Sequence, residues 1–152
     1  MTAALYAGAG LALLALVGAG LDLFTRRLPN ALCLVTATSG LAVSFALHGA
    51  VGVGSALLHG VLALLVGMAL FRFGVVGGGD AKFYAGVAMW FALGQAPRLL
   101  LAVSLAGLAL FVAWFLARRL MGRKVARRSA SDADKFPYGL AIAAGAILCW
   151  FG

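Results

Sequence analysis

The chain has only four acidic side chains, so any acid–base chemistry rests on very few positions. They are Asp22, Asp80, Asp132 and Asp134. Asp22 follows a long apolar stretch, and Asp80 follows a run of three glycines. Asp132 and Asp134 lie in a strongly basic segment, where solvated side chains are expected and no chemical role is predicted. Asp22 and Asp80 are therefore the candidates for catalysis.

Two carboxyl groups held close together can hydrolyse a peptide bond, as in aspartic proteases. Such a pair cannot ionise fully, so one group keeps its proton while the other acts as a base. The base takes a proton from the attacking water, and the protonated group donates a hydrogen bond to the peptide carbonyl oxygen. The pair titrates as a unit, so the sequence does not assign the proton to Asp22 or to Asp80.

The composition predicts that these aspartates are positioned by membrane helices. Of the 152 residues, 64% are hydrophobic and 11% are charged, whereas a soluble domain has about 25% charged residues. The apolar runs approach the length needed to cross ~30 Å of hydrocarbon. The expected fold is all-α, a bundle of six transmembrane helices. These helices are predicted at Ala3–Leu21, Ala31–Leu47, Val53–Phe73, Ala81–Leu93, Leu99–Ala117 and Tyr138–Phe151.

The basic residues predict that both termini lie on the outer side of the membrane. No basic residue precedes the first apolar run, and Arg26 and Arg27 follow it, so we expect a retained helix rather than a secretory signal. Of the twelve Lys and Arg residues, only Arg98 then falls in an outer loop. We predict one integral-membrane domain over residues 1–152 with a cytoplasmic basic loop at 118–136. That loop is expected to set topology, with binding of anionic lipid as an alternative.

Asp80 is predicted to lie within the hydrocarbon layer. A helix over Ala81–Leu93 rises only ~20 Å, so it must begin below the cytoplasmic surface. The glycines before it are expected to descend as non-helical backbone packed against other helices. A carboxyl at such depth indicates a functional site, although Asp80 can also cap the positive end of its helix. For Asp22 the alternative is an interfacial ion pair with neighbouring arginines.

Three separate stretches carry a resemblance to a known family. They are Asp22-Leu23-Phe24-Thr25-Arg26-Arg27-Leu28-Pro29-Asn30, Gly77-Gly78-Gly79-Asp80-Ala81-Lys82 and Pro137-Tyr138-Gly139-Leu140-Ala141-Ile142-Ala143. In this order on a six-span chain, they resemble the motifs of the type IV prepilin peptidases, which are GxGD aspartic proteases. The likeness is closest to the short forms that process small Flp-type pilins.

The resemblance implies that Asp22 and Asp80 are the catalytic residues. It implies removal of a prepilin leader after a glycine, at the cytoplasmic face of the inner membrane of a prokaryote. The partners it implies are prepilins and the lipid bilayer, with no nucleic acid, cofactor or metal. Large family members carry an amino-terminal region with paired CxxC motifs that is associated with methylation. This chain lacks such a region, so no methyltransferase domain is expected.

The other motif residues are given positioning roles. Pro29 or Asn30 is expected to start the second helix, with Asn30 capping its free amides. Lys82 either tunes the ionisation of Asp80, meets an acidic substrate residue, or anchors the helix at the membrane surface. The residues expected to shape the entry to the last helix are Pro137, Tyr138 and Gly139.

Other functions remain open from the sequence alone. Paired intramembrane acids also occur in proton-coupled transporters, although here both predicted sites lie on one face. A non-enzymatic subunit of a pilus or secretion assembly is a second alternative. A metal-dependent lipid-linked transferase is a third, but two carboxylates are few for a Mg²⁺ site. His48 and His59 are interpreted as packing or hydrogen-bonding residues rather than ligands.

Overall fold

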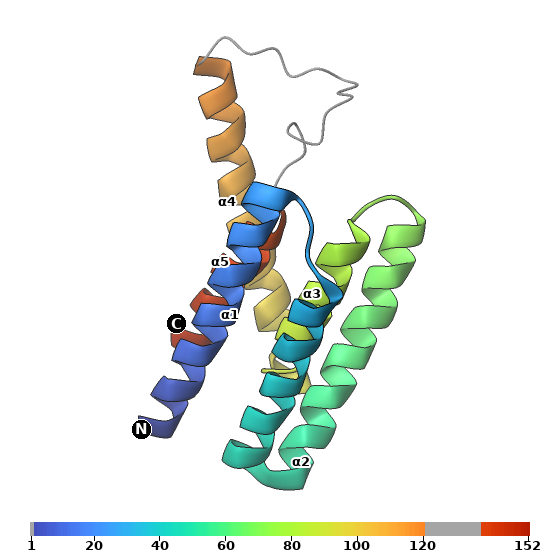
Figure 1. Ribbon diagram of the computed structural model, residues 1–152, viewed down its shortest axis with the longest axis vertical. Coiled ribbons are helices and arrows are strands. Elements are labelled where there is room, and N and C mark those ends of the chain that lie inside the picture. Colours follow the sequence, from blue (N-terminus) through green and yellow to red (C-terminus); the bar gives the residue numbers. More distant parts are fainter. Residues whose placement is uncertain (1, 121–137) are drawn as a thin grey trace.

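A computed structural model describes residues 2–120 and 138–152 of the chain (Figure 1). Every regular element within these ranges is helical, which confirms the predicted all-α class. The basic loop predicted at 118–136 lies almost entirely outside the described residues. The elements are α1 (Thr2–Thr25), α2 (Asn30–Arg72), α3 (Gly78–Ala88), the short 3₁₀ helix η1 (Leu93–Gln95), α4 (Ala96–Leu120) and α5 (Tyr138–Phe151).

Helix α2 is a hairpin of two antiparallel helical arms (Figure 1). Its 43 residues would extend ~65 Å as one straight helix, about twice the hydrocarbon thickness. The chain reverses at Gly49, whose φ of 65° and ψ of −159° are accessible to glycine and almost no other residue. We call residues 30–48 the first arm and residues 50–72 the second arm. The predicted helices end at Leu47 and begin again at Val53, whereas the observed helical arms extend through this gap to a single-glycine turn.

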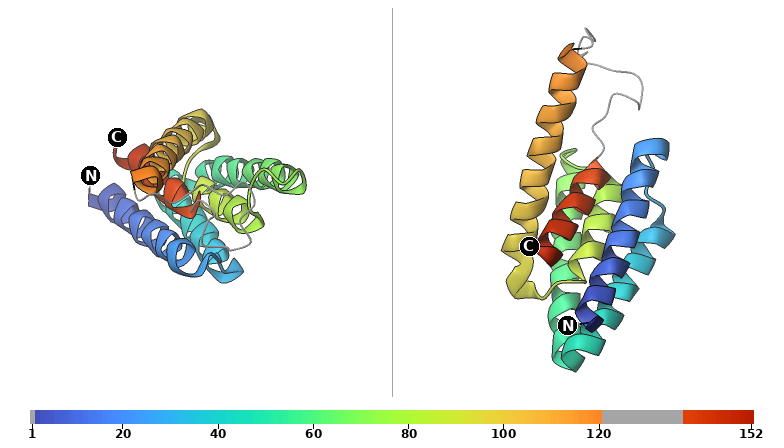
Figure 2. Two further views of the ribbon diagram at one scale, coloured as in Figure 1. Left: turned by 90° about the horizontal axis from the view of Figure 1, so that it is seen from above. Right: turned by 90° about the vertical axis from the view of Figure 1, so that its left-hand side faces the viewer.

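Several helices have the length and composition of membrane spans. Three are long and apolar enough to cross a bilayer, namely Thr2–Thr25, the hairpin Asn30–Arg72 and the segment Leu93–Ala117. Helix α5 is a shorter apolar helix whose bounds are those predicted for the last apolar run. The structure therefore supports an integral-membrane protein. Both described chain ends lie toward the end of the bundle opposite the C-terminus of α1 (Figures 1 and 2).

Helix α3 differs from the predicted fourth helix at both ends. It begins at Gly78 and ends at Ala88, so it includes two of the glycines expected to be non-helical. Gly77 precedes it in an extended conformation with φ −71° and ψ 144°. The glycines with positive φ are Gly49 and Gly74 instead. The three glycines therefore do not supply unusual torsions. They matter because residues without a side chain allow close packing.

The non-helical chain after α3 is held by side chains from α2. The Nδ1 atom of His59 lies 3.0 Å from the carbonyl oxygen of Phe91, and the amide of Leu93 donates to Ser55 Oγ at 2.9 Å. On the other side, the indole of Trp90 donates to the Thr36 carbonyl at 2.8 Å. Irregular backbone within a membrane protein needs such partners. His59 is therefore a buried hydrogen-bonding residue, as interpreted from the sequence.

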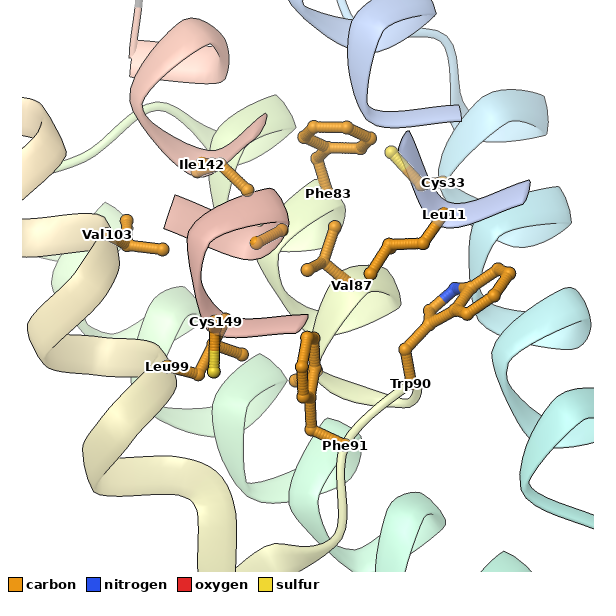
Figure 3. Close-up of a cluster of buried hydrophobic side chains, with 12 residues drawn as sticks. Leu11, Cys33, Phe83, Val87, Trp90, Phe91, Leu99, Val103, Ile142 and Cys149 are labelled. Carbon is orange, nitrogen blue, oxygen red and sulfur yellow. The ribbon is translucent and has the colours of Figure 1, made fainter. Parts of the chain in front are cut away.

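The core joins all five α-helices around α3 (Figure 3). Phe83 and Val87 of α3 are fully buried, and Figure 3 shows them between Leu11 of α1 and Ile142 of α5. Glycines let the helices approach closely, as expected for packing in lipid. A Cβ on Gly145 would lie 2.5 Å from the Cα atom of Val103 on α4. This packing fixes α3 within the bundle, and Asp80 is in its first turn.

Candidate active site

Asp22 lies in the last turns of α1 and is buried, with 8% of its surface exposed. Its Oδ2 atom accepts a 2.7 Å hydrogen bond from the backbone amide of Gly139, in the first turn of α5. The first amides of a helix have no partner within the helix, and negative charge is favourable there. Asp22 therefore caps α5. This contact was not predicted, because nothing in the local sequence links residues so far apart.

The position of the Asp22 side chain requires a glycine at residue 139. A Cβ at Gly139 would lie 2.8 Å from the Asp22 Cβ atom and 2.9 Å from its Oδ2 atom. Only glycine brings its amide this close without displacing the carboxyl. This supports the predicted role of Gly139 at the entry to the last helix. Tyr138 is the first residue of α5, whereas Pro137 lies outside the described residues.

Asp80 lies in the first turn of α3 and is half-buried. Its carboxyl packs against Gly77, where a Cβ would lie 2.6 Å from Asp80 Oδ2. The backbone of Gly77 also interacts with that carboxyl, and the Gly77 carbonyl accepts the first helical hydrogen bond from Ala81 at 3.0 Å. Gly79 faces Leu28, whose Cβ would be 3.4 Å from an added Cβ. The glycine run thus makes room for the Asp80 carboxyl and for the loop that follows α1.

The fold brings Asp22 and Asp80 into one region, although they come from different helices. Asp22 is among the charges that act on Asp80, so their carboxyls lie within range of electrostatic interaction. Both belong to the part of the bundle where α1 ends and where α3 and α5 begin. This end of the bundle therefore holds both candidate catalytic carboxyls.

The Pro29-Asn30 pair connects α3 to the start of α2. Pro29 is the residue before the helix, with φ −63° and ψ 140°, and Asn30 is the first helical residue. Asn30 makes no capping hydrogen bond, so that prediction is wrong. Its Oδ1 atom instead accepts a 3.0 Å hydrogen bond from Lys82 Nζ. The contact made by Lys82 is therefore with Asn30, and it links the second residue after Asp80 to α2.

An apolar cavity of about 450 Å³ adjoins Asp80. It lies between the second arm of α2 and α4, and α3 and α5 complete its walls. We call it the Asp80 cavity. Its lining is mainly aliphatic, with Tyr84, Ser104 and Tyr138 among the few polar groups. Asp22 is not among its lining residues. An extended apolar chain lying in this cavity would reach Asp80 at one of its walls.

Comparison with known proteins gives one match. The model of the type IV leader peptidase family matches residues 9–112, which include both aspartates and end before α5. Neither the curated proteins nor the solved structures contain a match. The matched segment covers more than half of the chain and agrees with the resemblance carried by the sequence motifs. The chain therefore belongs to the type IV leader peptidase family.

Proposed function

We propose that this chain is a membrane-embedded aspartic endopeptidase that removes the leader from a type IV prepilin of the Flp class. The observation that carries the proposal is the electrostatic interaction of Asp22 with Asp80, which lines an apolar cavity, in a chain of the leader peptidase family. These two are the only carboxylate side chains in residues 2–120 and 138–152. The reaction requires no bound metal or cofactor.

The proposed chemistry uses the two carboxyls in different protonation states. The ionised group accepts a proton from water as the water oxygen forms a bond to the scissile carbonyl carbon. The protonated group donates a hydrogen bond to the carbonyl oxygen, on which negative charge develops. Collapse of the tetrahedral intermediate breaks the C–N bond, and the amine leaves with a proton from the pair. The pair then returns to its initial state with one proton.

In this proposal the Asp80 cavity holds the substrate beside the Asp80 carboxyl. Its aliphatic walls suit an apolar segment of the prepilin, which would otherwise lie in the bilayer. The hydrogen bond from Gly139 holds the Asp22 carboxyl in position, and the packing of Gly77 restricts the Asp80 carboxyl. Prepositioned groups lower the barrier because they need little reorganisation during the reaction.

We place the site at the cytoplasmic face of the inner membrane, with six crossings. The crossings are α1, the two arms of α2, α3 with the chain that follows it, α4 and α5. The ends of α1, α2 and α4 lie at one end of the bundle, where Arg72 and Arg119 are exposed (Figure 1). Arg98 is at the opposite end, after η1. This distribution of basic residues supports the proposed orientation under the positive-inside rule.

The capping contact of Asp22 favours one alternative, in which the chain is a non-enzymatic assembly subunit. Both aspartates would then only stabilise helix ends. A proton-coupled transporter is the other alternative, and it would not cleave a prepilin at all. Asparagine keeps hydrogen-bonding capacity at either position but cannot act as the base. Conservative replacement of each aspartate therefore separates catalysis from capping.

The test is leader removal in cells that co-express this chain with a candidate Flp-type prepilin. We expect the wild type to convert the prepilin to a shorter product, and Asp22→Asn and Asp80→Asn to leave it uncleaved at equal expression. Asp134→Asn is the matched control and is expected to cleave normally. Added chelator should leave cleavage in purified membranes unchanged. Normal cleavage by either Asp22→Asn or Asp80→Asn would refute the mechanism.

A further inference from the structure

A second cavity of about 630 Å³ lies at the end of the bundle opposite the aspartates. It is bounded by the start of α1, the Gly49 turn of α2, η1 and the end of α5. We call it the Arg98 cavity. It shares no lining residue with the Asp80 cavity, so it is a separate feature of the fold. Nothing in the proposed peptidase mechanism uses it.

The polar groups of the Arg98 cavity suit an anion. Arg98 is exposed and contributes a permanent positive charge, and the other hydrogen-bonding side chains of the lining are those of Gln95, His48, Ser44 and Ser55. No carboxylate side chain lines the cavity, and Arg98 forms no ion pair with any residue that the structure describes. A cation that lines a cavity together with hydrogen-bonding side chains, and that has no acidic partner, favours a negatively charged ligand.

Two serine hydroxyls extend this donor set into the protein. Ser44 is only 5% exposed, and its hydroxyl makes no hydrogen bond to any residue within 2–120 or 138–152. An unpaired hydroxyl at such a depth is costly unless a ligand satisfies it. The oxygen of Ser55 already accepts a hydrogen bond from Leu93, which leaves its proton available for donation. Both hydroxyls can therefore serve an oxygen-rich ligand.

The rest of the cavity lining is apolar and includes an exposed side chain. Trp150 packs edge-to-face against Trp90 and Phe91, with ring centroids 6.2 and 5.7 Å apart. Val51 also lines the cavity and is 85% exposed at the Gly49 turn. Such an apolar rim does not contribute to the binding of a small inorganic anion. A lipid can place its head group among the polar residues and its chains along the apolar ones.

We propose that the Arg98 cavity binds the phosphate group of an anionic phospholipid at the outer side of the membrane. The Arg98 guanidinium pairs with the phosphate oxygens, and Ser44 and Ser55 provide hydroxyl donors. The planar guanidinium offers two parallel N–H donors, which match two phosphate oxygens. The bound lipid would connect the turn of α2 with the starts of α1 and α4. This proposal takes the membrane orientation from the proposed function, but it does not depend on the peptidase reaction.

Tryptophan fluorescence provides a local readout. The chain has three tryptophans, of which Trp90 and Trp150 line the cavity. Trp114 lies on α4 beside Phe111, so a Trp114→Phe background confines the emission to the cavity. This protein, purified in detergent, is titrated separately with dioleoylphosphatidylglycerol, with the matching phosphatidylcholine and with inorganic phosphate. We expect a saturable change in emission with phosphatidylglycerol, at lower concentration than with either other compound.

Substitutions in the Trp114→Phe background test the assigned contacts. Arg98→Gln should weaken phosphatidylglycerol binding by about tenfold or more, as expected for the loss of a charge-assisted hydrogen bond. Arg98→Lys should restore part of the affinity, and Ser44→Ala should lower it by a smaller factor. Arg119→Gln, at the opposite end of the bundle, is the matched control and should bind like the background protein.

Three results would overturn the proposal. The first is equal affinity for phosphatidylglycerol and phosphatidylcholine, since it would remove the preference for net negative charge. The second is unchanged binding by Arg98→Gln. The third is saturation by inorganic phosphate at the same concentrations as by phosphatidylglycerol, which would assign the cavity to a free anion and not to a lipid.

Discussion

The backbone amide of Gly139 donates a 2.7 Å hydrogen bond to Oδ2 of Asp22, joining the start of α5 to the end of α1. One carboxyl is thereby both a helix cap and a candidate catalytic group. The two roles are compatible, because a carboxylate has two oxygens and several acceptor positions. The contact fixes one oxygen of Asp22 and leaves the other for chemistry. Changes at Gly139 should therefore affect catalysis without removing any reacting group.

Replacement of Gly139 by alanine should displace the Asp22 carboxyl. The added Cβ would lie 2.8 Å from the Asp22 Cβ atom, so the start of α5 or the side chain must move. A displacement near 1 Å lowers a rate by on the order of 10- to 100-fold. The measurement is leader cleavage by purified Gly139→Ala. The control is Gly20→Ala, where a Cβ meets no atom within 4 Å; equal rates for both variants would contradict the account.

Loss of either partner in the Lys82–Asn30 hydrogen bond should have similar consequences. We expect Lys82→Met and Asn30→Ala to reduce cleavage by comparable, modest factors, because each removes the side-chain hydrogen bond between α3 and the start of α2. The contact is exposed, so its contribution to stability is at most ~1 kcal/mol. Cleavage rates of the two single variants and of the double variant give the coupling energy between Lys82 and Asn30. If Lys82→Met alone reduced activity, Lys82 would act on the substrate or on Asp80 instead.

A larger side chain in the Asp80 cavity should impair substrate binding. Ser104 lines this cavity and its neighbour Leu105 does not, so Ser104→Phe and Leu105→Phe form a matched pair on α4. A steric mismatch in an apolar pocket is worth ~1–3 kcal/mol, which corresponds to about tenfold or more. We expect Ser104→Phe to raise KM for the prepilin by this factor. An unchanged KM would mean that the substrate lies elsewhere.

Replacement of Gly49 should destabilise the hairpin of α2. The backbone there has φ 65° and ψ −159°, a conformation that costs other residues on the order of 1–3 kcal/mol. Thermal unfolding of Gly49→Ala in detergent should thus occur at a lower temperature than that of the wild type. Gly54→Ala in the second arm is the control, since no atom lies within 4 Å of its added Cβ. An equal midpoint for both variants would argue against the glycine turn.

The sequence predicted the helical segments well, because long apolar runs are their direct signature. It predicted α5 with the observed bounds. It missed the end of α3 at Ala88, because the apolar pattern continues through residues that leave the helix. The chain after α3 is held by His59 and Ser55, which are distant in sequence. Single-sequence patterns carry no information about such partners.

The sequence singled out the two acids of the candidate site, but it did not predict their surroundings. Scarcity made Asp22 and Asp80 stand out as candidates. The partner of Asp22 was missed because a helix cap is normally sought within a few residues along the chain. The same local assumption assigned Asn30 to capping, whereas its side chain accepts a hydrogen bond from Lys82. In each case a tertiary contact replaced the local one.

The most direct test of the proposed aspartyl pair is the cleavage rate of purified Asp22→Asn, Asp80→Asn and the double variant on one prepilin. If the two carboxyls act as a unit, each single variant should lose roughly 10⁴-fold or more in rate. The double variant should then cleave about as fast as the less active of the two single variants. Substantial cleavage by either single variant, or losses that multiply in the double variant, would contradict a shared catalytic pair.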